Sequence, residues 1–292
     1  MKKITLGWLC AGLISLAFFT GRADAAVDPL WTTPITPFRI AGNLYYVGGK
    51  DLASYLLVTS QGDILINSNY EASAAQIRRS VEELGFRFKD IRILLISHAH
   101  RDHDSGSAAI KRATGARYMV MDDDVPVVET GGKADFQYPG DRYPAVRVDR
   151  VLHDGDEVRL GDTVLVAHKT PGHTRGCTTW TVRETEQGRA LDVVIVGSWN
   201  VNPGYRLVDR PAHPASYPGI AADFQRTFEV LKHLHCDVFL GAHGAYFDML
   251  EKLHRRTPTT ATSVWIDPAG YKAAVRAKER AFQAELARQS HT

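Results

Sequence analysis

The sequence predicts a single α/β domain, and three observations indicate this fold class. Short apolar and β-branched runs that are typical of strands alternate with segments of helical periodicity over most of the chain. The run Ile93–Ile96 is continuously apolar, as expected for a strand that is covered on both faces. No linker, low-complexity segment or tight repeat divides the 292 residues, of which 44% are hydrophobic and 23% charged. This composition is that of an ordinary globular protein with a sizeable core.

The N-terminal segment is predicted to be a secretory signal and not part of the fold. Two lysines precede the apolar stretch 6–19, and the small-x-small tripeptide at 23–25 marks a cleavage site. The apolar stretch is too short for a membrane anchor, because a spanning helix needs roughly twenty such residues. We therefore expect residues 1–25 to be removed on export to the periplasm, and residues 26–292 to form the mature domain, free of the membrane.

The charge of the mature chain gives no indication of a nucleic-acid partner. The whole sequence has 35 basic and 33 acidic residues, and removal of residues 1–25 leaves 32 of each, without a basic patch. Cys177 and Cys236 remain, and export would allow a bond between them, but two cysteines do not form a disulfide framework. We expect no disulfide and a monomeric protein.

The first part of the mature chain is predicted to hold three strands, a helix and a buried strand, in that order. The three short strands are separated by polar turns: Leu44–Val47, Tyr55–Val58 and Asp63–Ile66. An amphipathic helix is expected over Glu71–Leu84, because Ile77 and Val81 share one face and Gly85 ends the pattern. The buried strand Ile91–Ile96 follows this helix.

The second part is predicted to continue with three helices and six strands. The strands are short apolar and β-branched runs: Arg117–Met121, Val148–Leu152, Val164–His168, Thr178–Val182, Val193–Val196 and Val238–Leu240. A helix over Ser107–Ala113 precedes them, and Ile220–Leu234 is a strong helix with Phe224 and Phe228 on one face. A terminal helix rich in Ala, Lys, Arg and Glu is expected over Tyr271–Arg288.

Histidines gather at the ends of predicted strands. All 12 histidines lie beyond the signal, and five occupy glycine-flanked turns at strand ends: His98, His100, His103, His173 and His243. Such turns allow the backbone to bring side chains into a shared cleft. Four others lie in or beside helices: His233, His235, His254 and His291. For His153 and His168, hydrogen bonding to loop backbone is the favoured role.

The motif HAHRDH at 98–103 indicates a metal site with two ions. Neutral imidazole and carboxylate are typical zinc ligands, and a catalytic zinc usually takes three protein ligands and a water. The motif offers too many ligands for one such ion, so two neighbouring groups are the economical interpretation. A structural zinc would close its tetrahedron, normally with thiolates, and the chain has no CxxC pair. The pattern therefore favours catalytic metal.

These motifs resemble those of the metallo-β-lactamase superfamily. HAHRDH, the later PGHT and the still later GAHG carry the resemblance, which implies an αββα sandwich with a dinuclear site at the edge of its two sheets. Longer stretches are similar to class B β-lactamases of the third subclass: VLHDGDEVRLGD, PGHTRGCTTWTV, ETGGKADFQY and CDVFLGAHGAYF. The resemblance runs from about Pro34 to the terminal helix.

The resemblance implies the ligand sets of two zinc ions. The first ion would be held by three histidines: His98, His100 and His173. The second would be held by one carboxylate and two histidines: Asp102, His103 and His243. Asp102 would also orient a zinc-bound hydroxide, and Asp104 is expected to be structural or to support the ligands.

One position discriminates between relatives within the superfamily. Glyoxalase II-like hydrolases, lactonases and phosphodiesterases carry a metal-bridging Asp where this chain has Ser198, and a serine there resembles the third subclass. Ser198 and Asn200, with Arg206, are candidates to bind the carboxylate of a substrate, and a solvated loop is the alternative. Arg101 departs from the family pattern, and a cation at the mouth of the site would alter substrate preference.

The expected reaction is zinc-dependent hydrolysis of the β-lactam amide bond by a metal-bound hydroxide. Penicillins, cephalosporins and carbapenems would be the small-molecule substrates, and the activity would confer antibiotic resistance. A serine mechanism would need an S-x-x-K motif, which SAAQ and SVEE do not supply. Two alternatives remain open: another metal-dependent hydrolase of the superfamily, glyoxalase II-like or lactonase, and a zinc-binding protein without turnover.

Overall fold

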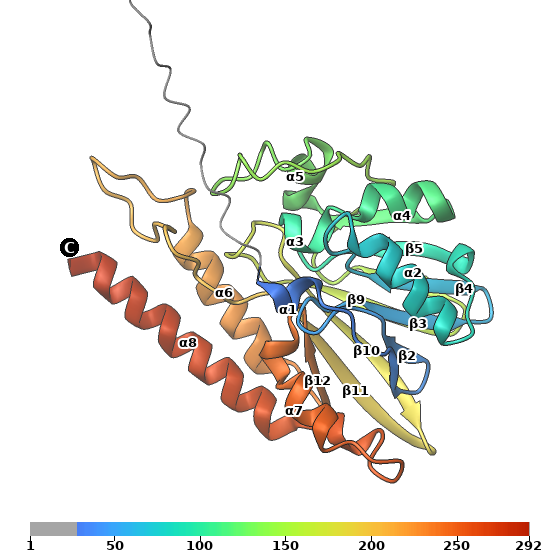
Figure 1. Cartoon of the computed structure of the whole chain (residues 1–292). Helices are drawn as coiled ribbons and strands as arrows, with labels where there is room; N and C mark the ends of the chain where they lie inside the picture. The colour runs from blue at the N-terminus through green and yellow to red at the C-terminus, as the bar shows by residue number, and fades with distance from the viewer. Residues whose placement is uncertain (1–27, 292) are drawn as a thin grey trace, which may run out of the picture.

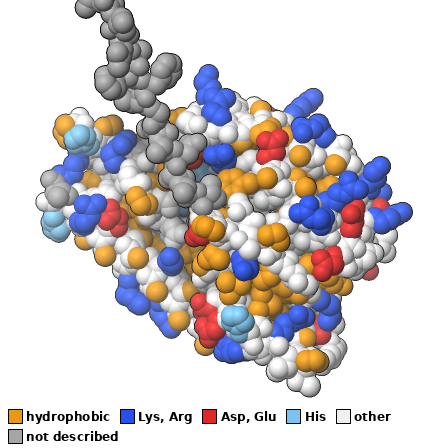
Figure 2. Space-filling model, viewed as in Figure 1, with side chains coloured by type: hydrophobic (Ala, Val, Ile, Leu, Met, Phe, Trp, Pro, Cys, Tyr) orange, Lys and Arg blue, Asp and Glu red, His pale blue; other side chains and the backbone are white. Residues whose placement is uncertain are grey.

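A computed structural model describes residues 28–291, so the predicted signal at 1–25 lies outside the described residues. Within this range, two β-sheets lie between outer layers of helices (Figure 1). None of the helices in the described range is both long and apolar enough to cross a membrane. On the face shown in Figure 2, basic and acidic side chains are interspersed.

The first sheet has seven strands whose order in space follows the chain. They are β1 (Phe38–Ala41), β2 (Leu44–Tyr46), β3 (Tyr55–Thr59), β4 (Gly62–Ile66), β5 (Ile91–Leu95), β6 (Arg117–Met121) and β7 (Arg150–Leu152). The strands β1 to β4 form antiparallel pairs, and β4 to β7 form parallel pairs. Because β4 to β7 run in the same direction, their carboxyl ends meet at one edge of the sheet.

The second sheet has five strands in the order β12-β11-β10-β9-β8. Their bounds are β8 (Glu157–Leu160), β9 (Thr163–Lys169), β10 (Thr178–Glu186), β11 (Arg189–Val196) and β12 (Val238–Gly241). The strands β8 to β11 form antiparallel pairs, and only β12 joins its neighbour β11 in parallel, with Val193 opposite Val238.

Helices cover the outer face of each sheet. The longer ones are α2 (Ser73–Glu83), α4 (Ser107–Thr114), α6 (Ile220–His233) and α8 (Pro268–His291). Figure 1 shows α2 and α4 against the first sheet, with α6 and α8 on the opposite side of the molecule beyond the second sheet. Short helices complete the layers: α1 (Pro29–Thr32), α3 (Arg101–Asp104), α5 (Val125–Glu129) and α7 (Met249–His254).

The core is divided by the first sheet into two layers. On β4, Ile64 and Ile66 pack between the sheets, whereas Leu65 packs against the helical side. On β5, Ile93 and Leu95 alternate with Leu94 in the same way. Successive side chains of a strand point to opposite faces, so a strand buried on both faces is apolar without interruption. The expectation drawn from the apolar run before the histidine motif is confirmed.

The predicted fold class is confirmed, with differences at the level of short elements. The α/β architecture and the two-sheet sandwich are present, and every predicted strand and helix overlaps an observed one. The sequence did not indicate β1, β8 or the four short helices, since runs of four to six residues carry little periodicity. Strand β10 extends to Glu186 because its second half is a half-exposed ribbon with β11. Cys177 and Cys236 are both free and buried.

Candidate metal centre

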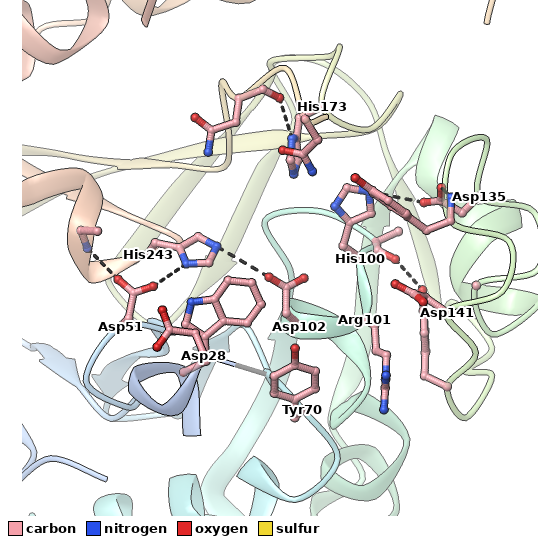
Figure 3. A pocket seen from close by; sticks show the side chains of 18 of the residues that line it. Asp28, Asp51, Tyr70, His100, Arg101, Asp102, Asp135, Asp141, His173 and His243 are labelled. Carbon is pink, nitrogen blue, oxygen red and sulfur yellow. Dashed lines mark hydrogen bonds and ion pairs between the residues drawn. The ribbon is translucent and has the colours of Figure 1, made fainter. Parts of the chain in front are cut away.

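The five candidate histidines meet at one edge of the two sheets. The run that ends β5 continues into His98 and His100, and α3 follows directly with His103. His173 lies in the turn between β9 and β10, and His243 follows β12. Figure 3 shows His100, His173 and His243 facing a common cavity together with Asp102. Three segments far apart in the sequence therefore build one site.

The first group of donors consists of His98, His100 and His173, as the sequence predicts. Each histidine is buried and offers one ring nitrogen, and these nitrogens lie within 4.8 Å of one another. The ring centroids of the three pairs are 4.6–4.9 Å apart. Three imidazoles in this arrangement can hold one metal ion and leave a position for water.

The second group consists of Asp102, His103 and His243. His103 Nε2 lies 3.2 Å from Asp102 Oδ2 and 3.2 Å from His243 Nε2, and the third distance, from His243 Nε2 to Asp102 Oδ2, is 3.6 Å. Ligand bonds of about 2.0–2.1 Å in a tetrahedron place ligand atoms about 3.3 Å apart. The observed spacing therefore suits a zinc-sized ion. The rings of His98 and His103 are 4.3 Å apart, so the two groups are neighbours.

Hydrogen bonds fix which ring nitrogen of two histidines faces the cavity. His173 Nδ1 donates to the backbone carbonyl of Asn200 at 2.8 Å, and His243 Nδ1 donates to Asp51 Oδ2 at 2.8 Å (Figure 3). A carbonyl or carboxylate oxygen only accepts, so Nδ1 carries the proton and Nε2 keeps its lone pair. This is the tautomer that binds metal, and a carboxylate behind a histidine is a common support for zinc ligands.

The charges of the donors match a divalent cation. Burial, with the neighbouring histidines, holds the pKa of His98 and His173 well below the ordinary value, so both are neutral. Burial opposes ionisation of Asp102, but the neighbouring His103 more than offsets this effect and lowers the pKa of the Asp102 carboxyl. The pKa of His100 is raised although burial lowers it, because Asp135 Oδ2 lies 3.4 Å from Nε2. Imidazoles, which bind zinc in their neutral form, together with one anionic carboxylate form the donor set that zinc prefers.

Asp124 joins two of the loops that carry the donors. Its carboxylate accepts hydrogen bonds from the backbone of Ala99 at 2.9 Å, the hydroxyl of Thr174 at 2.8 Å and the backbone of Gly176 at 2.9 Å. A side chain on Gly176 would meet the backbone of Asp124 at 2.5 Å, so glycine is needed for this close approach. Sequence reasoning missed Asp124, Asp51 and Asp135, because no motif in the neighbouring residues distinguishes them from other aspartates.

Asp104 supports the site from inside the fold, as expected. Its carboxylate is buried and accepts hydrogen bonds from Ser107 Oγ at 2.6 Å and from the hydroxyl of Tyr118 at 2.5 Å. Burial raises its pKa to about 7 despite these bonds. Asp104 therefore anchors α3 to α4 and β6 and does not face the donors.

Four of the six donors line a cavity of about 730 Å³, which suits a small-molecule ligand: His100, Asp102, His173 and His243. Besides the donors, aromatic and polar side chains line it: Trp31, Tyr70, Tyr138, Asn200, Asn202 and Tyr246. Among the lining residues, Arg101 is the only Lys or Arg, and its guanidinium lies 5.7 Å from the centre of the Tyr70 ring.

The three predicted carboxylate-binding residues have different positions. Asn200 lines the cavity, and its Nδ2 donates to the hydroxyl of Tyr246 at 3.1 Å. Ser198 is buried, and its hydroxyl lies 3.1 Å from the same Tyr246 hydroxyl. Arg206 is exposed outside the cavity, where Nε donates to the carbonyl of Pro214. The expectation that Arg206 lies at the site is therefore wrong, because its neighbour Tyr205 turns inward and directs Arg206 outward.

The fold and the donor set define a metal-dependent hydrolase. A sequence model of the metallo-beta-lactamase superfamily matches residues 48–243, and the chain belongs to this superfamily. The FEZ-1 metallo-beta-lactamase from Legionella gormanii is 50% identical with a TM-score of 0.84, over 89% of this chain and 98% of that one. The subclass B3 metallo-beta-lactamase BJP-1 of Bradyrhizobium japonicum is 36% identical with a TM-score of 0.82, over 90% and 98%. The predicted resemblance to the third subclass is confirmed.

Curated relatives match over a shorter stretch. A hydroxyacylglutathione hydrolase of a Methylobacterium strain is 36% identical over 112 residues, which are 38% of this chain and 36% of that protein. A probable metallo-hydrolase of Burkholderia pseudomallei is 35% identical over 113 residues, which are 39% of this chain and 37% of that protein. The matched stretch thus spans about a third of the curated relatives, and both names describe hydrolases.

Proposed function

We propose that this protein hydrolyses the amide bond of β-lactam antibiotics. The observation that carries the proposal is the position after β11, where Ser198 stands with its hydroxyl 3.1 Å from that of Tyr246 and the chain has no Asp at this place. A bridging Asp at this place is expected for a glyoxalase II-like hydrolase. The proposal is supported by solved relatives named metallo-beta-lactamases, which match along almost their whole length.

Two zinc ions are proposed as cofactors, one for each donor group. Three imidazoles would hold the first ion, and the Asp102 group would hold the second. Zinc lowers the pKa of a bound water to around 7, which makes a hydroxide nucleophile available at neutral pH. The distances of 3.2–3.6 Å within the second group fit an ion of this size.

The side chains of the cavity would orient the substrate and hold protons. Asp102 is ionised and faces the cavity, so it would accept a hydrogen bond from the attacking water and fix its direction. Asn200 Nδ2 would donate to the carboxylate of the lactam, and Arg101 at the rim would attract anionic substrates. Trp31 and Tyr70 offer flat apolar surface for the substituents of the ring.

Export to the periplasm, and hence a role in antibiotic resistance, is proposed from the sequence of residues 1–25 alone. Expression of the whole chain in a bacterium, followed by N-terminal sequencing of the purified protein, tests it. A mature protein that begins near residue 26 is expected. A protein that stays in the cytoplasm with residues 1–25 still attached would contradict export.

The test of the main proposal is turnover of β-lactams by the purified mature domain. Hydrolysis of nitrocefin and of a carbapenem is expected, lost on exhaustive chelation, restored by zinc and resistant to clavulanate. A glutathione thioester is the comparison substrate for the glyoxalase II-like alternative. Preferential hydrolysis of the thioester, or lactam hydrolysis that survives chelation, would contradict the proposal.

A further inference from the structure

A lysine of the C-terminal helix reaches the loop behind the metal centre. Lys278 lies on α8, which runs along the outside of the molecule (Figure 1), and its Nζ donates to Asn200 Oδ1 at 2.8 Å. Lys278 is half-buried, and burial lowers the pKa of its ammonium. In the described part of the chain, no carboxylate lies within ion-pair distance of Lys278 Nζ. A half-buried cation whose hydrogen-bond acceptor is an amide oxygen calls for an explanation.

The contact determines which end of the Asn200 amide faces the cavity. An ammonium group has three donors and no acceptor, so it accepts only the oxygen end of an amide as its partner. With Oδ1 held by Lys278, the amide nitrogen must point the other way, where it donates to the hydroxyl of Tyr246. Asn200 lines the cavity, so the second hydrogen of this nitrogen is available to a ligand.

We infer that Lys278 is a positioning residue that holds Asn200 with its N–H donor toward the anionic group of the substrate. This inference rests on the proposed function, and it identifies the residue that orients Asn200 for its contact with the substrate carboxylate. Without the ammonium, the amide of Asn200 is free to turn over and present its oxygen, which repels a carboxylate. The backbone carbonyl of the same residue accepts from His173, so the loop is held at two points.

Helix α8 is attached to the fold independently of Lys278. Phe282 stacks on Phe224 and Phe228 of α6 with ring centroids 5.4 and 5.8 Å apart. The hydroxyl of Tyr271 donates to the carbonyl of Leu231 at 2.7 Å. Removal of the ammonium is therefore expected to leave the helix docked and the protein folded.

The first test compares Lys278→Met with Lys278→Arg in the zinc-loaded enzyme. For a carboxylate-bearing lactam such as nitrocefin, Lys278→Met is expected to raise KM about three- to tenfold with little change in kcat, metal content or Tm. Lys278→Arg should recover most of the loss, because its guanidinium also donates without accepting. Lys272→Met, an exposed lysine of the same helix, is the matched control and is expected to behave as the wild type.

The second test is a double-mutant cycle with Asn200→Ala. If Lys278 acts through Asn200, Lys278→Met should have almost no further effect on KM in the Asn200→Ala background. Multiplicative effects, or a Lys278→Met enzyme equal to the wild type, would overturn the inference. A wild type without lactam hydrolysis would instead contradict the proposed function. In that case, the ¹H–¹⁵N NMR signals of the Asn200 side-chain amide test the inference. They should shift in Lys278→Met and stay unchanged in Lys272→Met. Signals that stay unchanged in both variants would overturn the inference.

Discussion

Asp51 and His243 form a pair in which an aspartate far away in the sequence selects the tautomer of a metal donor. Asp51 accepts from His243 Nδ1 and from the backbone of Ala245, both at 2.8 Å. The hydrogen bond from Ala245 fixes the carboxylate of Asp51. The hydrogen bond from His243 Nδ1 then directs His243 Nε2 toward Asp102 and His103. A histidine without this acceptor would divide its population between two tautomers and several ring orientations.

Asp51→Ala should therefore weaken metal binding at the second donor group by about 10–100-fold. The first donor group should keep its affinity, since its histidines do not contact Asp51. Zinc titration against a competing chelator measures both affinities in one experiment. Asp51→Asn, whose carbonyl still accepts from Nδ1, is the control and should lose less. Equal loss at both donor groups would contradict this assignment.

Ser198 is the residue on which the distinction from glyoxalase II-like hydrolases depends. Its hydroxyl contacts the hydroxyl of Tyr246, which also accepts a hydrogen bond from the side-chain amide of Asn200. Ser198→Ala should keep the full metal content and raise KM about two- to tenfold, because one hydrogen bond that supports the cavity is lost. Metal analysis and steady-state kinetics on the same preparation check this. Loss of one equivalent of zinc would show that Ser198 is a ligand.

At the level of elements, the site depends on how three loops are held together. The loop after β5, the short helix α5 with its preceding turn, and the loop between β9 and β10 meet at Asp124. Burial raises the pKa of this carboxyl to about 6 although three groups donate to it. At neutral pH, the carboxylate form of Asp124 therefore still accepts the three hydrogen bonds that hold these loops together.

Asp124→Ala should destabilise the protein by about 2–5 kcal/mol, because the buried N–H groups of Ala99 and Gly176 would lose their acceptor. Metal affinity at His98, His100 and His173 should fall as well, since the loops that carry them would separate. Urea unfolding and zinc titration measure the two effects. Asp124→Asn keeps one oxygen and the same shape, so it should fall between wild type and alanine. An alanine variant with wild-type stability would refute this role.

At the level of the whole molecule, the contact between the two sheets contains an acid. Glu184 on β10 is buried against the turn between β1 and β2, where the backbone of Asn43 donates to it at 3.2 Å. Burial raises its pKa from 4.5 to about 7. The folded state therefore favours the protonated acid, and its contribution to stability is complete below pH 4.5 and is lost as the pH rises to about 7.

Glu184→Gln should remove this pH dependence. The free energy of unfolding of the variant minus that of the wild type should increase by up to about 3 kcal/mol from pH 4.5 to 7. Above pH 7 this difference should stay constant. Urea unfolding over this range, at saturating zinc, provides the measurement. Glu71→Gln at an exposed position is the control and should give a constant difference. A Glu184→Gln difference that does not change with pH would contradict the prediction.

The sequence by itself determined the fold class, the order of the long elements and the six donors. These features are local: apolar alternation marks a strand, and His98, His100, Asp102 and His103 lie within six consecutive residues. The remaining donors stand in short glycine-flanked turns that resemble known motifs. Such signals are visible in the sequence because backbone periodicity and ligand spacing act over a few residues.

Only the tertiary structure decided which residues support these donors. Asp51, Asp124 and Lys278 form hydrogen bonds with partners that are 25 to 194 residues away, and nothing in their own neighbourhoods marks them. The same reason explains the error at Arg206, whose direction follows from the packing of Tyr205. Long-range hydrogen bonds and the direction of a loop side chain depend on how sheets and helices pack, and that packing has no local pattern in the sequence.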